Sequence, residues 1–326
     1  MIICQTPLRI SFFGGGTDFP EFFEHHGGAV LAAAIDKFIY HSVTRFPSAL
    51  FDYSIRLAYR KVECVKNVSD IEHGPFREIL RSLEIERDVE INLAADLPAF
   101  SGLGSSSSFT VGLIHALMAF RGQFISKSEL AYRAINIERN ILKDAVGCQD
   151  PVMAAFGGLN IVRFSREDDI MVTRIPLRPE RSQELDESLL LFFTGIRRRA
   201  GDLERNKLNR LSEIEKNLTT MLKLVDRAHD LLTGNEPLSE FGRLLHLTWM
   251  EKRCLDPGVS SPQIDRMYET GMRAGALGGK LLGAGGGGFM AFFVPPERQA
   301  AVRAQLREYF EVPFHIGAPG SSIIHS

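Results

Sequence analysis

Apolar and polar residues follow two different spacings along this chain, so the pattern predicts a mixture of strands and helices. The alternation from Val89 to Leu93 predicts a half-buried strand, and the apolar spacing from Phe109 to Met118 predicts a helix. Apolar residues recur every three or four positions from Leu211 to Leu232, which is typical of a long amphipathic helix. Further strands are expected at residues 159–164, 189–193, 289–294 and 312–316.

Short polar signals indicate where other helices begin. Ser126 and Glu129 form a capping-box pattern, and Ser261-Pro262 supplies an N-cap followed by a proline at the first helical position. A last helix is expected over residues 297–309. The polar stretch 165–188, which contains two prolines, is expected to be the junction between two domains.

On the helix that follows Ser126, Glu138 falls on the apolar face. That face is defined by Ala131, Ala134, Ile135, Ile141, Leu142 and Ala145. A buried carboxylate is costly without a partner, so either a basic side chain or a cation must satisfy it.

Three glycine-rich segments interrupt this pattern. Residues 98–108 join the strand ending near Leu93 to the helix that contains Phe109, and their backbone N–H groups open onto a helix N-terminus, which favours a phosphate. A flexible linker or an ordinary helix cap is the alternative, but the tight strand-to-helix connection argues against a linker. No G-x-x-x-x-G-K-[ST] motif occurs in the chain, which argues against a P-loop NTPase.

The other two glycine segments lie near the ends of the chain. Residues 14–16 place three glycines shortly before Asp18, and residues 283–288 contain five glycines. The second segment matches G-x-G-x-x-G, but the apolar run that follows is strand-like, whereas a dinucleotide fingerprint must open a helix. A strand, glycine loop and strand are therefore predicted, with Lys280 either reaching a phosphate or only flanking the loop.

Composition narrows the range of partners. The 326 residues suggest about two domains, and 38 basic against 40 acidic side chains leave no global field to attract nucleic acid or a membrane. Four well-separated cysteines and the absence of zinc-type histidine spacing argue against structural zinc and fit a reducing compartment. No secretory leader pattern or long apolar run is present. We expect a cytoplasmic protein with small-molecule partners, whose state as monomer or homodimer the sequence leaves open.

The three glycine motifs, taken in order, resemble those of the GHMP small-molecule kinases. The motifs are Pro7-x-Arg9-(x)4-Gly14-x-x-Thr17-Asp18, Gly102-Leu-Gly-Ser-Ser106 and Lys280-Leu-x-Gly-Ala-Gly-Gly-Gly-Gly288. They span nearly the whole chain. Within that family, the run from Arg9 to Asp18 and the segment Thr194-Gly-Ile-x-Arg198 are most similar to those of bacterial kinases acting on D-glycero-D-manno-heptose 7-phosphate.

The resemblance implies an α+β fold of two domains with the active site between them. Residues 1–180 would form an N-terminal domain like ribosomal protein S5 domain 2, and residues 181–326 a ferredoxin-like C-terminal domain. ATP and Mg²⁺ would be the cofactors. The ATP-binding residues would be Pro98, Ser101, Gly102, Leu103, Gly104, Ser105, Ser106 and Ser107.

The resemblance also implies roles for individual side chains. Ser106 and Glu138 would be the magnesium ligands, since Glu138 precedes Asp150 much as the family's magnesium glutamate precedes its catalytic aspartate. Asp150 would be the general base, although an aspartate before proline is by itself a common turn initiator. Arg9 would keep Asp150 ionised and offset charge on the transferring phosphoryl group. The substrate would contact Gly15, Gly16, Thr17, Asp18, Arg198, Gly285 and Gly286.

One departure from the galactokinase-like members concerns the substrate. Their first motif reads Gly-Glu-His-Thr-Asp, whereas Gly15 and Gly16 stand at the Glu and His positions here. The loss of two bulky polar side chains leaves room for a longer, phosphorylated sugar. Arg198, within the basic run 197–199, would bind that phosphate, the alternative being a solvated basic face.

The sequence thus predicts an ATP-dependent kinase that phosphorylates the anomeric hydroxyl of D-glycero-D-manno-heptose 7-phosphate to the 1,7-bisphosphate, for surface glycan synthesis. Kinases for fucose, arabinose or galactose are alternatives of the same class. A non-catalytic sensor of sugar and nucleotide is the alternative of a different class, and the joint presence of Arg9, Ser106, Glu138 and Asp150 argues against it. A decarboxylase is a further alternative, for which the sequence gives no signal.

Overall fold

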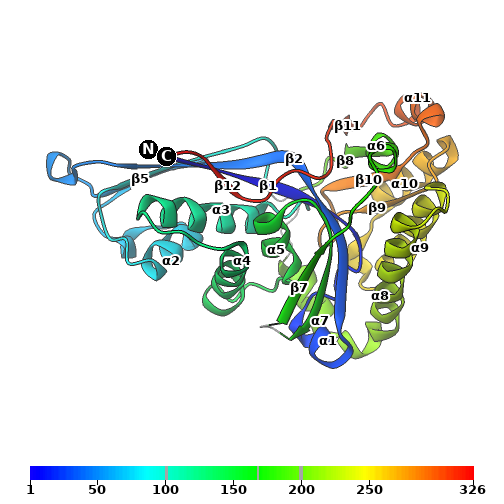
Figure 1. The fold of residues 1–326 in the computed structure, drawn as a ribbon, viewed down its shortest axis with the longest axis horizontal. Coiled ribbons are helices and arrows are strands. Elements are labelled where there is room, and N and C mark those ends of the chain that lie inside the picture. Colours follow the sequence, from blue (N-terminus) through cyan, green and yellow to red (C-terminus); the bar gives the residue numbers. More distant parts are fainter. Residues whose placement is uncertain (100–101, 167–168, 198–200) are drawn as a thin grey trace.

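The structure, a computed structural model, describes residues 1–99, 102–166, 169–197 and 201–326. Its elements form two sheets with helices packed against them, as an α+β fold requires (Figure 1). The first sheet has the strand order β12-β1-β2-β5-β3-β4, with β6 pairing to β2 and β7 to β6. These strands are β1 (Ile2–Phe13), β2 (Gly28–Arg45), β3 (Ile55–Ala58), β4 (Val62–Val65), β5 (Val89–Ala95), β6 (Leu159–Arg166), β7 (Asp169–Arg174) and β12 (Ser322–His325).

Neighbouring strands of this sheet run antiparallel, except that β3 and β5 are parallel. Because β12 pairs with β1, the two ends of the chain lie side by side (Figure 1). Helices α2 to α5 lie together along one face of the long strands. The helices of this half are α1 (Pro20–His26), α2 (Gly74–Ser82), α3 (Ser105–Phe120), α4 (Lys127–Ile135) and α5 (Gln149–Phe156), with a π-helical turn at Asn136–Ile141 after α4.

The second sheet is antiparallel, in the order β11-β8-β10-β9. Its strands are β8 (Leu189–Phe193), β9 (Gly278–Leu281), β10 (Phe289–Phe293) and β11 (Phe310–Glu311). Its helices are α6 (Pro179–Glu187), α7 (Gly201–Asn209), α8 (Leu211–Thr233), α9 (Ser239–Arg253), α10 (Pro262–Ala274) and α11 (Pro296–Gln305). Short 3₁₀ turns occupy Ser48–Leu50, Val68–Asp70 and Pro257–Val259.

Several predicted elements are confirmed. The strand from Val89 and the helix after the glycine–serine loop are β5 and α3. The long amphipathic helix is α8, and the Ser261 hydroxyl caps α10 by accepting a hydrogen bond from the backbone N–H of Ile264. The last glycine loop connects the antiparallel strands β9 and β10, as a strand, loop and strand require.

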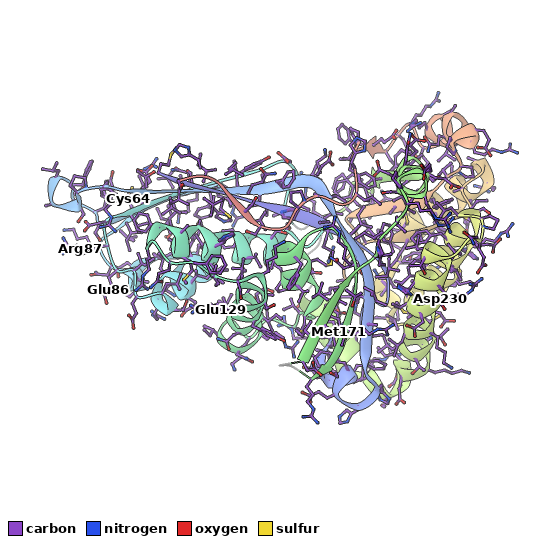
Figure 2. All side chains as sticks on the ribbon, in the orientation of Figure 1. Cys64, Glu86, Arg87, Glu129, Met171 and Asp230 are labelled. Atoms are coloured by element: carbon purple, nitrogen blue, oxygen red, sulfur yellow. The ribbon has the colours of Figure 1, made fainter. Side chains whose placement is uncertain are left out.

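The stretch 165–188, predicted as the domain junction, contains β7 and α6, and its role as a junction stays a prediction. Strand β7 pairs with β6 at the border of the first sheet, and Met171 on it is 59% exposed (Figure 2). Strand β7 is apolar only at residues 170–172, too short a run to predict a strand within a polar stretch. The domain boundary at residue 180 stays a prediction.

Two predictions near the C-terminus are also corrected. The strand expected at 312–316 is wrong, because the paired strand is β11 and Ile316 forms an isolated bridge with Ile35. The last helix ends at Gln305, before the predicted Tyr309. Strand β12 was missed because its few apolar residues give no long periodic signal.

An aromatic contact closes the core where β1 ends. Phe241 of α9 packs edge-on against Phe12 and Phe13, with ring centroids 5.3 Å and 5.1 Å apart. All three rings are fully buried. A helix from the second half of the chain therefore supports the strand end from which the first glycine loop starts.

We expect Phe241→Ala to lower the free energy of unfolding by about 3–5 kcal/mol, because truncation of a buried ring leaves a cavity. Phe124→Ala is the matched control, since that ring is 91% exposed, and its effect should stay within about 0.5 kcal/mol. Urea unfolding followed by circular dichroism measures both values. Similar values for the two variants would contradict this account of the core.

Candidate active site

The first glycine loop follows directly from β1. Gly14 has a φ of +79°, and a Cβ there would lie 1.9 Å from the carbonyl oxygen of Ala29, so the turn requires glycine. The fully buried hydroxyl of Thr17 lies 2.8 Å from the Gly14 carbonyl oxygen and 2.9 Å from that of Ala29. Thr17 therefore holds the loop in shape, and its hydroxyl is engaged with backbone rather than free for a substrate.

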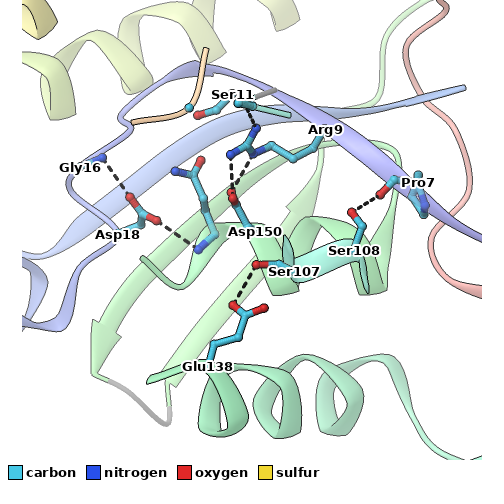
Figure 3. Close-up of polar contacts among 12 residues, drawn as sticks. Pro7, Arg9, Ser11, Gly16, Asp18, Ser107, Ser108, Glu138 and Asp150 are labelled. Carbon is cyan, nitrogen blue, oxygen red and sulfur yellow. Dashed lines mark hydrogen bonds and ion pairs between the residues drawn. The ribbon is translucent and has the colours of Figure 1, made fainter. Parts of the chain in front are cut away.

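The loop presents Asp18 beside the start of α5 (Figure 3). The Asp18 carboxylate accepts hydrogen bonds from the backbone N–H groups of Gly16, at 2.9 Å, and Gln149, at 3.2 Å. A Cβ on Gly147 would lie 1.9 Å from this carboxylate, so glycine is needed there as well. Burial, followed by the charge of Asp150, raises the pKa of Asp18 to about 6.

Arg9 and Asp150 form a two-pronged ion pair. Arg9 Nε and Nη2 donate to the two carboxylate oxygens of Asp150, each at 2.7 Å (Figure 3). The third arm of the guanidinium donates to the carbonyl oxygen of Gly102 at 2.7 Å. The Arg9 side chain is 5% exposed and that of Asp150 is 24% exposed, so the carboxylate stays accessible from one side.

Asp150 lies in the first turn of α5 rather than in an isolated turn. The sequence pattern alone favoured the turn, since an aspartate before proline commonly initiates one. A proline is equally well tolerated in the first helical turn, where its missing N–H has no intrahelical partner. The structure therefore brings the two predicted catalytic residues into direct contact at a helix N-terminus.

The second glycine loop leads into α3. Gly102 and Gly104 have φ values of +79° and +74°, and Gly104 is an N-cap without a side-chain hydrogen bond. The first amides of α3 are thus left without a capping side chain, in an orientation that favours an anion. Ser106 is exposed in this turn, as is Pro98 before the loop, whereas Ser107 is buried.

Glu138 lies in the π-helical turn that follows α4, and it is 2% exposed. Its Oε2 accepts a hydrogen bond from the hydroxyl of Ser107 at 2.8 Å (Figure 3), and its Oε1 is buried without a partner among the described residues. Burial raises the pKa of Glu138 to about 8, against the hydrogen bonds from Ser107 and Thr110 that lower it. A hydroxyl rather than a basic side chain therefore partners Oε2, and Oε1 is left for another group.

The inward face predicted for this helix is buried as far as Glu138, and beyond it Leu142 is half-buried against the core. Ile141 is 40% exposed, although the pattern placed it inside. A π turn is wider than an α turn, so it shifts the angular phase of every later residue. π turns are frequent at functional sites, which agrees with the burial of Glu138 in this one.

A divalent ion fits the carboxylate of Glu138. The described part of the chain contains no cluster of three His, Cys, Asp or Glu side chains able to hold a metal by itself. Mg²⁺ does not need one, because it usually keeps several waters and binds one or two carboxylates together with substrate phosphates. The unpartnered Oε1 of Glu138 supplies an oxygen of the kind that Mg²⁺ prefers.

The third glycine loop packs against the second. A Cβ on Gly283 would lie 2.5 Å from the Cα of Gly102, so the two loops touch through backbone. Gly285 is buried against Val259, and the N–H of Gly286 donates to the Val259 carbonyl oxygen at 2.8 Å. In this arrangement the amide of Gly286 already has a backbone partner.

Three buried lysines surround this loop, and two of them gave no signal in the sequence. Lys280 donates to the carbonyl oxygens of Ser11 and Phe12, at 2.9 Å and 3.0 Å. Lys252 donates to Leu281 and Gly283, and Lys207 to Ala284. Burial lowers the pKa of Lys280 to about 7 and that of Lys252 well below its usual value. Lys280 therefore reaches the end of β1 as well as flanking its own loop.

Two predicted site residues, Ser101 and Arg198, lie outside the described residues, as does Arg199. The neighbouring Thr194 is buried, and its hydroxyl and backbone N–H both donate to the Gly288 carbonyl oxygen. The segment before Arg198 is thereby held against the third glycine loop.

Family models and whole-chain relatives match this chain. Residues 61–158 match the GHMP kinase N-terminal domain, and residues 208–312 match the GHMP kinase C-terminal domain. A D-glycero-alpha-D-manno-heptose 7-phosphate kinase from Campylobacter jejuni is 31% identical over 93% of this chain and 92% of its own length. An L-fucokinase/L-fucose-1-P guanylyltransferase from Bacteroides fragilis is 26% identical over 92% of this chain, which spans 35% of that protein.

The fold has a close structural counterpart. The crystal structure of a D-glycero-D-manno-heptose 1-phosphate kinase from Bacteroides thetaiotaomicron superposes with a TM-score of 0.81, over all of both chains, at 24% identity. In the described residues, no helix is both long and apolar enough to cross a bilayer. The order of the three glycine loops, the two family matches and the similarity over the whole length lead to one conclusion: the chain belongs to the GHMP kinase family and is a kinase.

Proposed function

We propose that this kinase transfers the γ-phosphoryl group of ATP to the anomeric hydroxyl of D-glycero-D-manno-heptose 7-phosphate. The two-pronged Arg9–Asp150 pair, beside a glycine loop at a helix N-terminus, is the observation that carries the proposal. The similarity to the heptose 7-phosphate kinase of Campylobacter jejuni over 93% of the chain supports the substrate class. Phosphoryl transfer needs positioning and charge neutralisation more than covalent chemistry, and this arrangement offers both.

Asp150 is proposed as the general base. Arg9 donates a hydrogen bond to each carboxylate oxygen of Asp150 and so fixes the orientation of the carboxylate. The exposed side of Asp150 can accept the proton of the attacking hydroxyl. The guanidinium is also proposed to offset negative charge that develops on the transferring group. A protein that only senses sugar and nucleotide would not need this pair, which argues against that alternative.

ATP is proposed to bind through the loop from Gly102 to Ser107 and the uncapped first turn of α3. Ser106 and Glu138 are the proposed ligands of Mg²⁺, which when bound would neutralise phosphate charge. The hydrogen bond from Ser107 orients Glu138 within this proposed metal site. Ser106 is exposed in the same helical turn and stays accessible to the ion and the phosphates.

The sugar is proposed to lie against the first glycine loop. Gly15, where a Cβ would meet nothing nearer than 3.6 Å, leaves room in this loop, and the carboxylate of Asp18 is proposed to accept hydrogen bonds from sugar hydroxyls. Arg198 is the proposed ligand of the sugar's own phosphate. A kinase for a neutral sugar such as fucose is the second candidate, which the 26% identity to the Bacteroides fragilis fucokinase favours.

A substrate panel with Asp150→Asn tests the function. ADP release should be fastest with D-glycero-D-manno-heptose 7-phosphate among that sugar, mannose, fucose, galactose and mevalonate. The variant should lower kcat by about 10²- to 10⁴-fold, the usual contribution of a general base. Asp226→Asn, which breaks the exposed ion pair with Arg163, is the matched control and should leave kcat unchanged. Preferred turnover of a neutral sugar would refute the proposed substrate.

Glu138→Gln tests the metal role. The amide keeps the size of the side chain and its acceptor for Ser107 but removes the charge, so the Mg²⁺ concentration needed for half-maximal activity should rise at least about tenfold. Stabilisation of the protein by Mg²⁺-ATP in a thermal shift assay should weaken in parallel. Glu129→Gln, on the exposed face of α4, is the control. Unchanged magnesium dependence in both assays would remove Glu138 from the site.

The raised pKa of Asp18 predicts a pH dependence of sugar binding. Below pH 6 the carboxyl is protonated and has lost acceptor capacity, whereas above pH 6 it is ionised. The KM for the sugar should therefore fall as the pH rises through about 6. Steady-state kinetics from pH 5 to 7 measure it, and Asp18→Asn should abolish the trend. A trend that persists in Asp18→Asn would assign the titration to another group.

A further inference from the structure

Three polar side chains from separate parts of the chain converge on the space over Gly15. A Cβ built on Gly15 would lie 3.6 Å from Ser11 Oγ, 3.8 Å from Gln149 Nε2 and 3.8 Å from Lys280 Nζ. No backbone atom is among these nearest neighbours, and Gly15 is half-buried. Gly15 therefore leaves an opening of about the size of one methyl group, which polar side chains border.

Two of these side chains have unmet hydrogen-bonding capacity. Ser11 is 5% exposed, and its hydroxyl has no partner among the described residues. The amide oxygen of Gln149 is likewise buried and unpartnered. Lys280 has three donors and gives two of them to the carbonyl oxygens of Ser11 and Phe12. Unpaired polar atoms in a buried setting are rare, and they indicate a ligand or an ordered water.

The charges around the opening favour a neutral ligand group. Asp18 and Asp150 supply negative charge near Gln149, which donates its backbone N–H to Asp18 and immediately precedes Asp150. Lys280 and Arg9 supply positive charge, and the guanidinium of Arg9 is already engaged with Asp150 and Gly102. A free anion or cation would thus meet a like charge. A hydroxyl, which both donates and accepts, matches an amide oxygen, a serine hydroxyl and an ammonium donor.

We propose that Ser11, Gln149 and Lys280 form a subsite over Gly15 that binds one hydroxyl of the sugar, other than the hydroxyl that is phosphorylated. This inference rests on the proposed function and extends it to residues that determine specificity. A site built to hydrogen-bond a hydroxyl rejects an analogue that lacks it, because the polar groups of the site are then left unpaired. The subsite thereby selects among sugars by the presence and configuration of one hydroxyl.

Ser11→Ala and Gln149→Leu test the subsite with D-glycero-D-manno-heptose 7-phosphate and analogues deoxygenated singly at C2, C3, C4 or C6. Each variant should raise the KM for the parent sugar about tenfold, with the KM for ATP unchanged and kcat within about twofold. One deoxy analogue should show a raised KM with the unaltered enzyme and no further increase with either variant. If the effects of substitution and deoxygenation add for every analogue, the subsite does not exist.

Gly15→Ala provides a second test that leaves the polar groups intact. Gly15 has no positive φ, and an added methyl group would make only ordinary contacts, so the chain should fold normally while the opening is filled. The KM for the sugar should rise at least about tenfold. Gly74→Ala is the matched control, because its Cβ would also meet nothing nearer than 3.9 Å and it lies at the start of α2. Unchanged sugar KM in Gly15→Ala would overturn the proposal.

The proposed function can fail independently of this subsite. If no sugar phosphate is turned over, titration calorimetry with mannose, fucose and galactose applies the same variants to binding alone. Loss of affinity in Ser11→Ala, Gln149→Leu and Gly15→Ala, but not in Gly74→Ala, would support the subsite for a neutral sugar. Equal affinity in all four variants would overturn it.

Discussion

The ion pair between Arg9 and Asp150 is the interaction on which the site depends. Arg9 comes from β1, Asp150 from the start of α5, and the third arm of the guanidinium reaches the loop before α3. The backbone N–H of Arg9 also donates to the carbonyl oxygen of Leu103. One planar side chain therefore sets the relative positions of a strand, a helix N-terminus and a phosphate-type loop. Lysine, a flexible point charge, lacks the fork that makes these contacts simultaneous.

The backbone of the glycine loops lies so close to this ion pair that neither the loops nor the Arg9 side chain can shift far. Gly104 lies against the Arg9 side chain, where a Cβ would be 3.1 Å from Arg9 Cγ, and Gly102 touches Gly283 of the other sheet's loop. Charged groups of both signs are buried nearby, with the pKa values of Asp18 and Glu138 raised and those of Lys252 and Lys280 lowered. Polar groups fixed in a poorly solvated space cost little reorganisation when charge moves between them.

The sequence predicted the parts of this site that lie on continuous motifs. The three glycine loops, the helix after the second loop and the strand pair around the third could be predicted because turn residues and apolar spacing act locally. The contact between Arg9 and Asp150 was expected from the family resemblance, since no local rule joins residues so far apart in the chain. Lys207 and Lys252 gave no signal, because burial of a lysine depends on packing between distant elements.

The errors have physical causes as well. The π turn at Asn136–Ile141 shifted the phase of a helical pattern, so Ile141 was placed inside although it is exposed. Strand β7 is apolar only at residues 170–172, and the short strand β12 likewise carried too few apolar residues to be detected. Helical and strand periodicity thus predicted the long regular elements correctly. It failed at the π turn and at the short strands, where the backbone geometry or the number of apolar residues differs from that of a long helix or strand.

The pairing of β12 with β1 has a consequence for the order of folding. Strand β1, which carries Arg9, gains one of its two neighbours from residues 322–325, and the backbone N–H of Ser321 donates to the carbonyl oxygen of Ala154 of α5, the helix that begins beside Asp150. Contacts of such long sequence separation form slowly. The elements that carry Arg9 and Asp150 are therefore fixed in place late in folding, after the helices and hairpins that neighbouring residues build.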